Sequence, residues 1–270
     1  LAPTLSALIT DPFFYAVAVP AVILLGISKS GFGTGFGSLA VPIMALSVPV
    51  PQAAAILMPL LLVMDVLGLR AWRGHFDWKL LRFLLPCGLL GSVVGTLSFK
   101  LLDPRLVAGM VGLFTLSFLA QRLLFPPRAD SPPPSRWVGA LLSTASGFTS
   151  FVAHAGGPPI SVYVIPLRLS PMVFTGTMAV FFAALNLSKW VPYAWLGLLD
   201  LRNLVTSLVL LPLAPLGVFA LAASVGLAEL DVRARRLARL FGLVTRLRDA
   251  GPVTLDLVHR DGRIGQDWLA

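Results

Sequence analysis

Long stretches without a charged side chain are the feature that most restricts how this chain can fold. Residues 169–188 and 203–228 contain no Asp, Glu, Lys or Arg. A helix of about 20 apolar residues spans the hydrocarbon core of a bilayer. Hydrophobic residues make up 57% of the chain and charged residues 12%, against about 25% charged in soluble domains. The chain is therefore predicted to be an integral membrane protein.

The apolar runs predict the fold class. They lack the alternation of short segments that a transmembrane β-barrel shows. We therefore expect an all-α, polytopic membrane protein with about seven or eight transmembrane helices, some of them broken by Gly or Pro. The clearest spans are residues 13–28, 51–69, 83–99, 106–121, 137–153, 171–188 and 203–228, and a basic loop is expected at 70–82.

Two parts of the chain resemble each other at an offset of about 120 residues, as an internal duplication would produce. The duplication predicts a first transmembrane repeat over 1–121, a polar Pro/Arg-rich linker over 122–136 and a second repeat over 137–228. The matched positions are Gly31-Phe32 with Gly147-Phe148, Pro42 with Pro159, Pro51 with Pro171, and Asp77 with Asp200.

The remaining 229–270 segment is rich in Arg. It is expected to be either an amphipathic helix on the membrane surface or an atypical, out-of-frame tail. The formal net charge of +9 is explained by anionic lipid headgroups, so no nucleic-acid partner is expected. Cys87 is the single cysteine, which excludes a disulfide within the chain. The three histidines lie far apart in the sequence, so neither a metal nor a cofactor is expected.

Each repeat contains an apolar segment interrupted by Gly or Pro, at 30–37 and at 154–159. A pair of such breaks is the best sequence indication of a transporter's binding site. Backbone broken at membrane depth survives only if it is packed in protein or lines a wet cavity. The freed amides at the start of the next half-helix favour an anion. The alternative is that the glycines serve helix packing alone.

Polar side chains at these breaks are the candidate ligands. Lys29 is expected either to attract an anion or to extend toward the headgroups, and Lys189 to extend toward them. His154 could sense pH, shuttle a proton or donate to the substrate. Asp65 is expected to pair with Arg70 or to mark a helix end. The predicted substrate-binding residues are Lys29, Ser30, Gly31, Gly33, Thr34, Gly35, Ser150, His154, Gly156, Gly157 and Asn186.

Hydroxyl groups near the breaks have two interpretations. Thr34, Ser146, Thr149 and Ser150 could donate hydrogen bonds to an oxyanion. Each could instead bond to the backbone of its own helix.

The stretches LLGISKSGFGTGFGSLAVPIMAL (24–46) and GFTSFVAHAGGPPISVYVIPLRL (147–169) are similar to the TauE/SafE family of sulfite and organosulfonate exporters. The likeness extends over roughly residues 11–225, and the charged tail departs from the family pattern. The resemblance implies a polytopic protein of two related halves that moves sulfur-containing anions. The substrate class comes from the resemblance alone.

The residues and the resemblance together predict a multi-pass permease of the cell inner (plasma) membrane. Its expected partners are a small anionic substrate and membrane lipids, with proton coupling and oligomeric state left open. The expected substrate is sulfite or an organosulfonate, moved by alternating access. The protein is not expected to be an enzyme. The alternatives are a passive anion channel, a non-transporting scaffold, or an intramembrane enzyme using Ser150 and His154.

Overall fold

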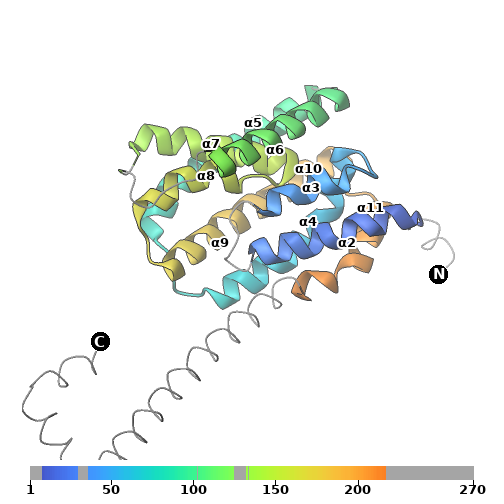
Figure 1. Ribbon diagram of the computed structural model, residues 1–270, viewed down its shortest axis with the longest axis horizontal. Helices are drawn as coiled ribbons and strands as arrows, with labels where there is room; N and C mark the ends of the chain where they lie inside the picture. Colours follow the sequence, from blue (N-terminus) through green and yellow to red (C-terminus); the bar gives the residue numbers. More distant parts are fainter. Residues whose placement is uncertain (1–7, 30–35, 102, 125–131, 133, 217–270) are drawn as a thin grey trace, which may run out of the picture. The chain divides into compact units, whose positions relative to one another are not determined.

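The computed structural model describes residues 8–29, 36–101, 103–124, 132 and 134–216, and within these ranges the chain is helical with no strand (Figure 1). The predicted all-α class is therefore confirmed for the described residues. In chain order the elements are α2 (Pro12–Ile27), η2 (Phe36–Leu39), α3 (Ala40–Met44), α4 (Val50–Ala71), α5 (Trp78–Leu101), α6 (Pro104–Leu124), α7 (Arg136–Ala153), α8 (Gly157–Val164), η3 (Ile165–Leu167), α9 (Pro171–Ser188), α10 (Trp190–Trp195) and α11 (Leu201–Leu210).

Among the described residues, three helical stretches are long and apolar enough to cross a membrane, namely Val50–Ala71, Trp78–Ser98 and Pro171–Trp195, which combines α9 and α10. Shorter apolar helices occupy Pro12–Ile27, Gly157–Leu167 and Leu201–Leu210. The predicted count of seven or eight spans stays a prediction. The 229–270 tail lies outside the described residues.

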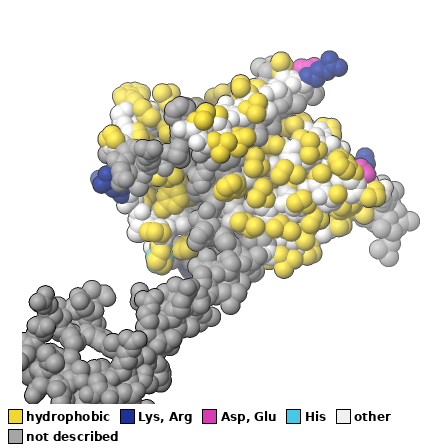
Figure 2. All heavy atoms as spheres, in the orientation of Figure 1, with side chains coloured by type: hydrophobic (Ala, Val, Ile, Leu, Met, Phe, Trp, Pro, Cys, Tyr) yellow, Lys and Arg dark blue, Asp and Glu magenta, His cyan; other side chains and the backbone are white. Residues whose placement is uncertain are grey.

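Large apolar side chains cover the outside of these helices, and yellow side chains dominate the face seen in Figure 2. Leu90, Leu116, Leu141 and Val191 are examples, each more than half exposed. Apolar area of this extent is stable against lipid and unfavourable against water.

Helix α5 begins earlier than the sequence predicts. The expected basic loop 70–82 is wrong in its second part, because the helix already starts at Trp78. Asp77 supplies the reason, since its Oδ1 accepts a hydrogen bond from the Leu80 amide at 2.9 Å and caps the helix. The guanidinium of Arg82 lies 5.9 Å from the centre of the Trp78 ring, so the charge is accommodated on the helix surface.

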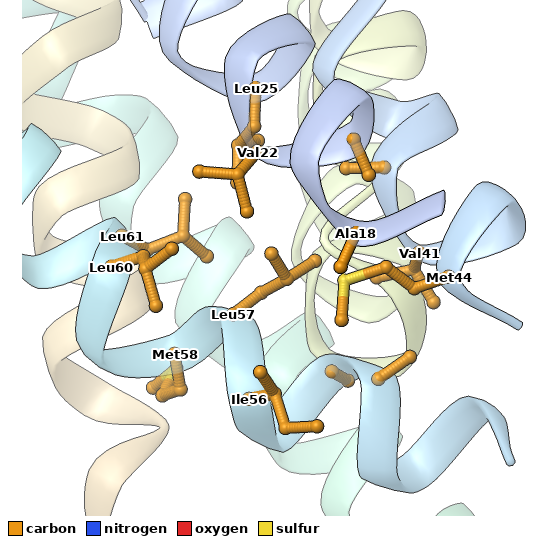
Figure 3. Close-up of a cluster of buried hydrophobic side chains, with 14 of the residues drawn as sticks. Ala18, Val22, Leu25, Val41, Met44, Ile56, Leu57, Met58, Leu60 and Leu61 are labelled. Carbon is orange, nitrogen blue, oxygen red and sulfur yellow. The ribbon is translucent and has the colours of Figure 1, made fainter. Parts of the chain in front are cut away.

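The largest apolar core joins α2, α3 and α4 (Figure 3). Its side chains include Ala18 and Val22 from α2, Met44 from α3, and Ile56 and Leu57 from α4, all essentially inaccessible to solvent. This core holds the end of α2 against the middle of α4. A second core joins α5, α8 and α9 around Phe181.

Among the described helices, α5 and α7 pack most closely. A Cβ added to Gly147 would overlap the carbonyl oxygen of Gly88, and one added to Gly91 would overlap that of Thr144. Only glycine allows two backbones to approach so closely. Ser143 adds a hydrogen bond across this contact, from its Oγ to the Leu84 carbonyl at 2.7 Å.

Two of the sequence-matched pairs occupy similar places at the starts of their helices. Pro51 stands in the first turn of α4 and Pro171 in the first turn of α9. Asp200 caps α11 as Asp77 caps α5, with its Oδ1 accepting from the Asn203 amide at 2.7 Å. The division into two repeats and a linker stays a prediction, and most of the 122–136 linker lies outside the described residues.

Candidate anion site between the broken helices

A cavity opens where the end of α2, the break between α7 and α8, and the long helices α4 and α9 meet. Its polar lining comes from both predicted repeats. Residues 28–29 and 37–38 belong to the first repeat, and Ser150, His154 and Asn186 to the second. The described residues on either side of the first break and those at the second break thus face one cavity.

The break between α7 and α8 is built around a left-handed residue. Helix α7 ends at Ala153, and His154 adopts φ 52° and ψ 26° before α8 begins at Gly157. This conformation is uncommon for residues other than glycine, although His tolerates it better than most. It turns the chain sharply enough to place the His154 side chain on the cavity wall.

Hydroxyl groups of α7 form hydrogen bonds with backbone carbonyls of the break between α7 and α8. Ser146 Oγ donates to the Gly156 carbonyl at 2.6 Å. Thr149 Oγ1 lies 3.0 Å from the Ala155 carbonyl and 2.9 Å from the Ala145 carbonyl of its own helix, so its hydrogen is shared between the break and the helix. The sequence leaves both side chains open as donors to an anion, whereas in the structure both bond to backbone carbonyls. Pro158 and Pro159 carry no N–H, so α8 offers fewer amide donors to an anion than the sequence analysis expects.

Charged groups meet at the centre of the cavity wall. Lys29 Nζ donates to Asp65 Oδ1 at 2.5 Å, and Asn186 Nδ2 donates to Asp65 Oδ2 at 2.6 Å. The expected pairing of Asp65 with Arg70 is wrong, because Arg70 points outward one turn further along α4 and is exposed. Lys29 reaches inward along the cavity and keeps 17% of its side chain accessible.

Lys189 stands behind this pair at the junction of α9 and α10. Its expected extension to the headgroups is wrong, because the side chain is completely buried. Its Nζ lies 2.7 Å from the Ser150 carbonyl oxygen, 2.8 Å from Ser150 Oγ and 2.9 Å from Asn186 Oδ1. These three acceptors hold the ammonium inside the protein, away from the headgroup region.

The charges around the cavity do not cancel. Lys29 and Asp65 form an ion pair, whereas Lys189 contacts only neutral acceptors among the described residues. A buried charge without a counter-ion is costly at membrane depth. The described part of the site therefore favours an incoming anion electrostatically.

His154 links the break to Lys189. Its Nε2 lies 2.9 Å from the Ala54 carbonyl oxygen, which can only accept, so Nε2 carries the hydrogen. Its Nδ1 lies 3.3 Å from Lys189 Nζ and is left to accept from the ammonium. The described residues thus hold His154 as a neutral ring between α4 and Lys189.

The structure brings together part of the predicted site. Lys29, Ser150, His154, Gly157 and Asn186 line the cavity. Gly156 lies just behind it, against Ser146 and Phe182. Ser30, Gly31, Gly33, Thr34 and Gly35 lie outside the described residues.

Asp65 and Lys189 belong to the site but are not among the residues predicted to bind substrate, although the sequence holds a signal for each. Asp65 stands 121 residues before Asn186, which is close to the offset of the duplication. Lys189 follows Asn186 by three residues, so the two side chains share one helix face.

Apolar outer faces, broken helices and a polar cavity between them define a helical membrane transport protein. The family model described as "Sulfite exporter TauE/SafE" matches residues 18–247. The chain belongs to the TauE/SafE sulfite exporter family and is an integral membrane protein. No curated protein and no solved structure matches the chain significantly. The family match extends beyond residue 225, where the resemblance was expected to end.

Proposed function

We propose that this protein is a permease of the inner membrane that moves sulfite or an organosulfonate by alternating access through the cavity between α2, α4, α7 and α9. The family indicates a sulfur-compound exporter, and the cavity supplies the means of binding an anion. Lys29 supplies positive charge at the wall, and Ser150 and Asn186 supply polar atoms beside it.

The observation that carries the proposal is the surplus positive charge. Of the described charged side chains near the cavity, Lys29 and the protonated form of Lys189 oppose the single carboxylate of Asp65. An anion that enters the cavity neutralises this surplus, and it does so in a poorly hydrated place where charge interactions are strong. A neutral or cationic substrate gains nothing from the arrangement.

Two features favour a carrier over a passive channel. The site lies between the two predicted repeats, where a rocking motion would open it alternately to each side. The polar network of Lys29, Asp65, Asn186 and Lys189 crosses from α2 through α4 to α9, so it ties together the elements that such a motion separates. A channel would need a continuous wet path instead.

The test is counterflow of labelled sulfite and of labelled methanesulfonate into proteoliposomes preloaded with the same unlabelled anion. Wild-type protein should exchange at least one of them above empty vesicles, and labelled choline should not enter. Accumulation of label against its gradient identifies a carrier. Flux that only equilibrates the label, with no trans-stimulation, would favour the channel.

Lys29→Met and Lys79→Met form a matched pair for this assay. Each variant removes one ammonium, but Lys79 is exposed on the surface of α5, away from the cavity. We expect exchange to fall by about tenfold or more in Lys29→Met, because a lost charge-assisted contact is worth about 1.5–3 kcal/mol. Equal exchange by the two variants would remove Lys29 from the site.

A further inference from the structure

Lys189 lies behind the cavity wall, and its hydrogen-bond partners separate it from the cavity. The side chain is fully buried and does not line the cavity itself, whereas its partners Ser150, His154 and Asn186 do. An anion in the cavity would therefore contact these partners, and it would interact with the charge of Lys189 without touching it. The role of Lys189 in the empty cavity is a separate matter, and what we assign to it rests on the proposed function.

An empty cavity leaves the buried ammonium of Lys189 without a counter-ion among the described residues. Two events relieve this cost: an anion enters, or the ammonium loses a proton. The second event is feasible only if the neutral amine also keeps its hydrogen bonds, because unsatisfied polar groups are expensive at this depth.

Four hydrogen-bond acceptors surround Lys189 Nζ, and together they can satisfy the neutral amine as well as the ammonium. The Ser150 carbonyl and Asn186 Oδ1 can only accept, and Asn186 is fixed in this orientation because its Nδ2 donates to Asp65. Ser150 Oγ is a hydroxyl, so it can accept from an ammonium or donate to the lone pair of an amine. His154 Nδ1 accepts from the ammonium, and from cavity water when the amine is neutral.

Both protonation states are thus satisfied without movement of a helix. The ammonium has three N–H donors, and four acceptors surround it. The neutral amine has two N–H donors, which the Ser150 carbonyl and Asn186 Oδ1 accept, and its lone pair accepts the hydrogen of the Ser150 hydroxyl. Ser150 touches Lys189 and also lines the cavity, so its Oγ is the path for a proton.

The other titratable groups around Lys189 support this assignment. His154 Nε2 is used by the Ala54 carbonyl, and its Nδ1 accepts from the Lys189 ammonium, so the ring is neutral while Lys189 is charged. Asp65 is paired with Lys29. Tyr193 on α10 uses its hydroxyl hydrogen for the Phe151 carbonyl at 2.7 Å. Among the described groups facing this point, Lys189 is the cation that makes no direct ion pair, and its hydroxyl partner Ser150 can either donate or accept.

We propose that Lys189 is the proton-binding residue of the transport cycle, taking up one proton when the anion enters the cavity and releasing it when the anion leaves. The nitrogen lone pair forms the N–H bond with a proton that arrives from cavity water through Ser150 Oγ. Anion and proton are then translocated together, and the gradients of both set the direction of net flux.

The experiment uses labelled methanesulfonate, because its sulfonate stays ionised over the working pH range and cannot carry the proton itself. Uptake into proteoliposomes is measured at equal pH on both sides and with an acidic exterior, with the membrane potential clamped by potassium and valinomycin. The readout is the ratio of the two rates, which is independent of how much active protein each preparation contains.

Wild type and the control Lys79→Arg should take up methanesulfonate faster with the acidic exterior. In Lys189→Arg the two rates should become equal, because guanidinium keeps its charge at every relevant pH. An undiminished response to acid in Lys189→Arg would overturn the proposal, as would equal rates in wild type. Absence of wild-type exchange at equal pH would instead overturn the proposed function, and this inference with it.

A second measurement on wild type avoids the variant if Lys189→Arg does not fold. Methanesulfonate is added to the purified protein in weakly buffered detergent solution, and proton uptake is followed with a pH indicator. We expect uptake that saturates with the anion, and an apparent Kd that rises by up to about tenfold per pH unit as the protonated form is lost. Anion binding without proton uptake would overturn the role of Lys189.

Discussion

Asp65 on α4 and Asn186 on α9 meet across the cavity wall, with Asn186 Nδ2 donating to Asp65 Oδ2 at 2.6 Å. The two residues stand 121 positions apart, close to the offset at which the chain resembles itself. The contact connects the two cations of the site, because Asp65 also binds Lys29 and Asn186 also binds Lys189. A substitution at any of these four residues should therefore alter the hydrogen bonding and charge balance of the other three.

Asp65→Asn should lower the free energy of unfolding by on the order of 3 kcal/mol, since removing one partner of a buried pair leaves an uncompensated charge. Lys29→Met in the same chain should restore part of this loss, because it removes the orphaned ammonium. The measurement is a double-mutant cycle of thermal unfolding in detergent. Additive effects of the two substitutions would show that the pair carries no coupling.

Gly147→Ala should prevent α5 and α7 from packing, because the new methyl group would overlap the Gly88 carbonyl. We expect a loss on the order of 3 kcal/mol or failure to fold, as is typical of overpacking against backbone. Gly112→Ala on α6 is the control, since a Cβ there meets nothing within 4 Å. Similar yield and melting temperature for both variants would contradict the close helix contact.

Thr149→Val should loosen the break between α7 and α8 by removing the hydroxyl that the Ala155 carbonyl shares with the Ala145 carbonyl. The expected cost is about 1–2 kcal/mol, because a buried acceptor loses its donor while the side-chain volume stays the same. Thr144→Val on the same helix removes only a bond to its own turn, at Ala140, and should cost less. Hydrogen exchange of the 153–157 amides should accelerate in Thr149→Val and stay unchanged in Thr144→Val.

His154→Gly should unfold at a higher temperature than His154→Ala, because glycine adopts φ 52° without the steric cost of about 1 kcal/mol that alanine meets there. Both variants lose the ring contacts with Ala54 and Lys189, so both should exchange anion more slowly than wild type.

Arg168 provides the matched position, since it has φ 55° at the end of η3 and does not line the cavity. Arg168→Gly should show the same advantage over Arg168→Ala while both keep anion exchange. Identical melting temperatures for the Gly and Ala variants at 154 would contradict the strained left-handed turn.

The sequence by itself determined the class of structure. Within lipid, the backbone N–H and C=O groups of an uncharged run of transmembrane length must bond to one another, and a helix achieves this. The described residues are helical accordingly. Helix starts at Pro171 and Arg136 follow from local signals, Ser170 and Ser135 acting as caps. The broken segments were visible because Gly and Pro act on the backbone locally.

Tertiary structure alone decided which side chains share the cavity. Nothing near Lys29 in sequence announces Asp65 as its partner, since the two lie 36 residues apart on different helices. Lys189 resembles any lysine at the end of an apolar helix, and only the approach of α7 to the α9–α10 junction buries it against Ser150. Periodicity and capping are local properties, whereas the balance of charge in a cavity depends on which helices meet.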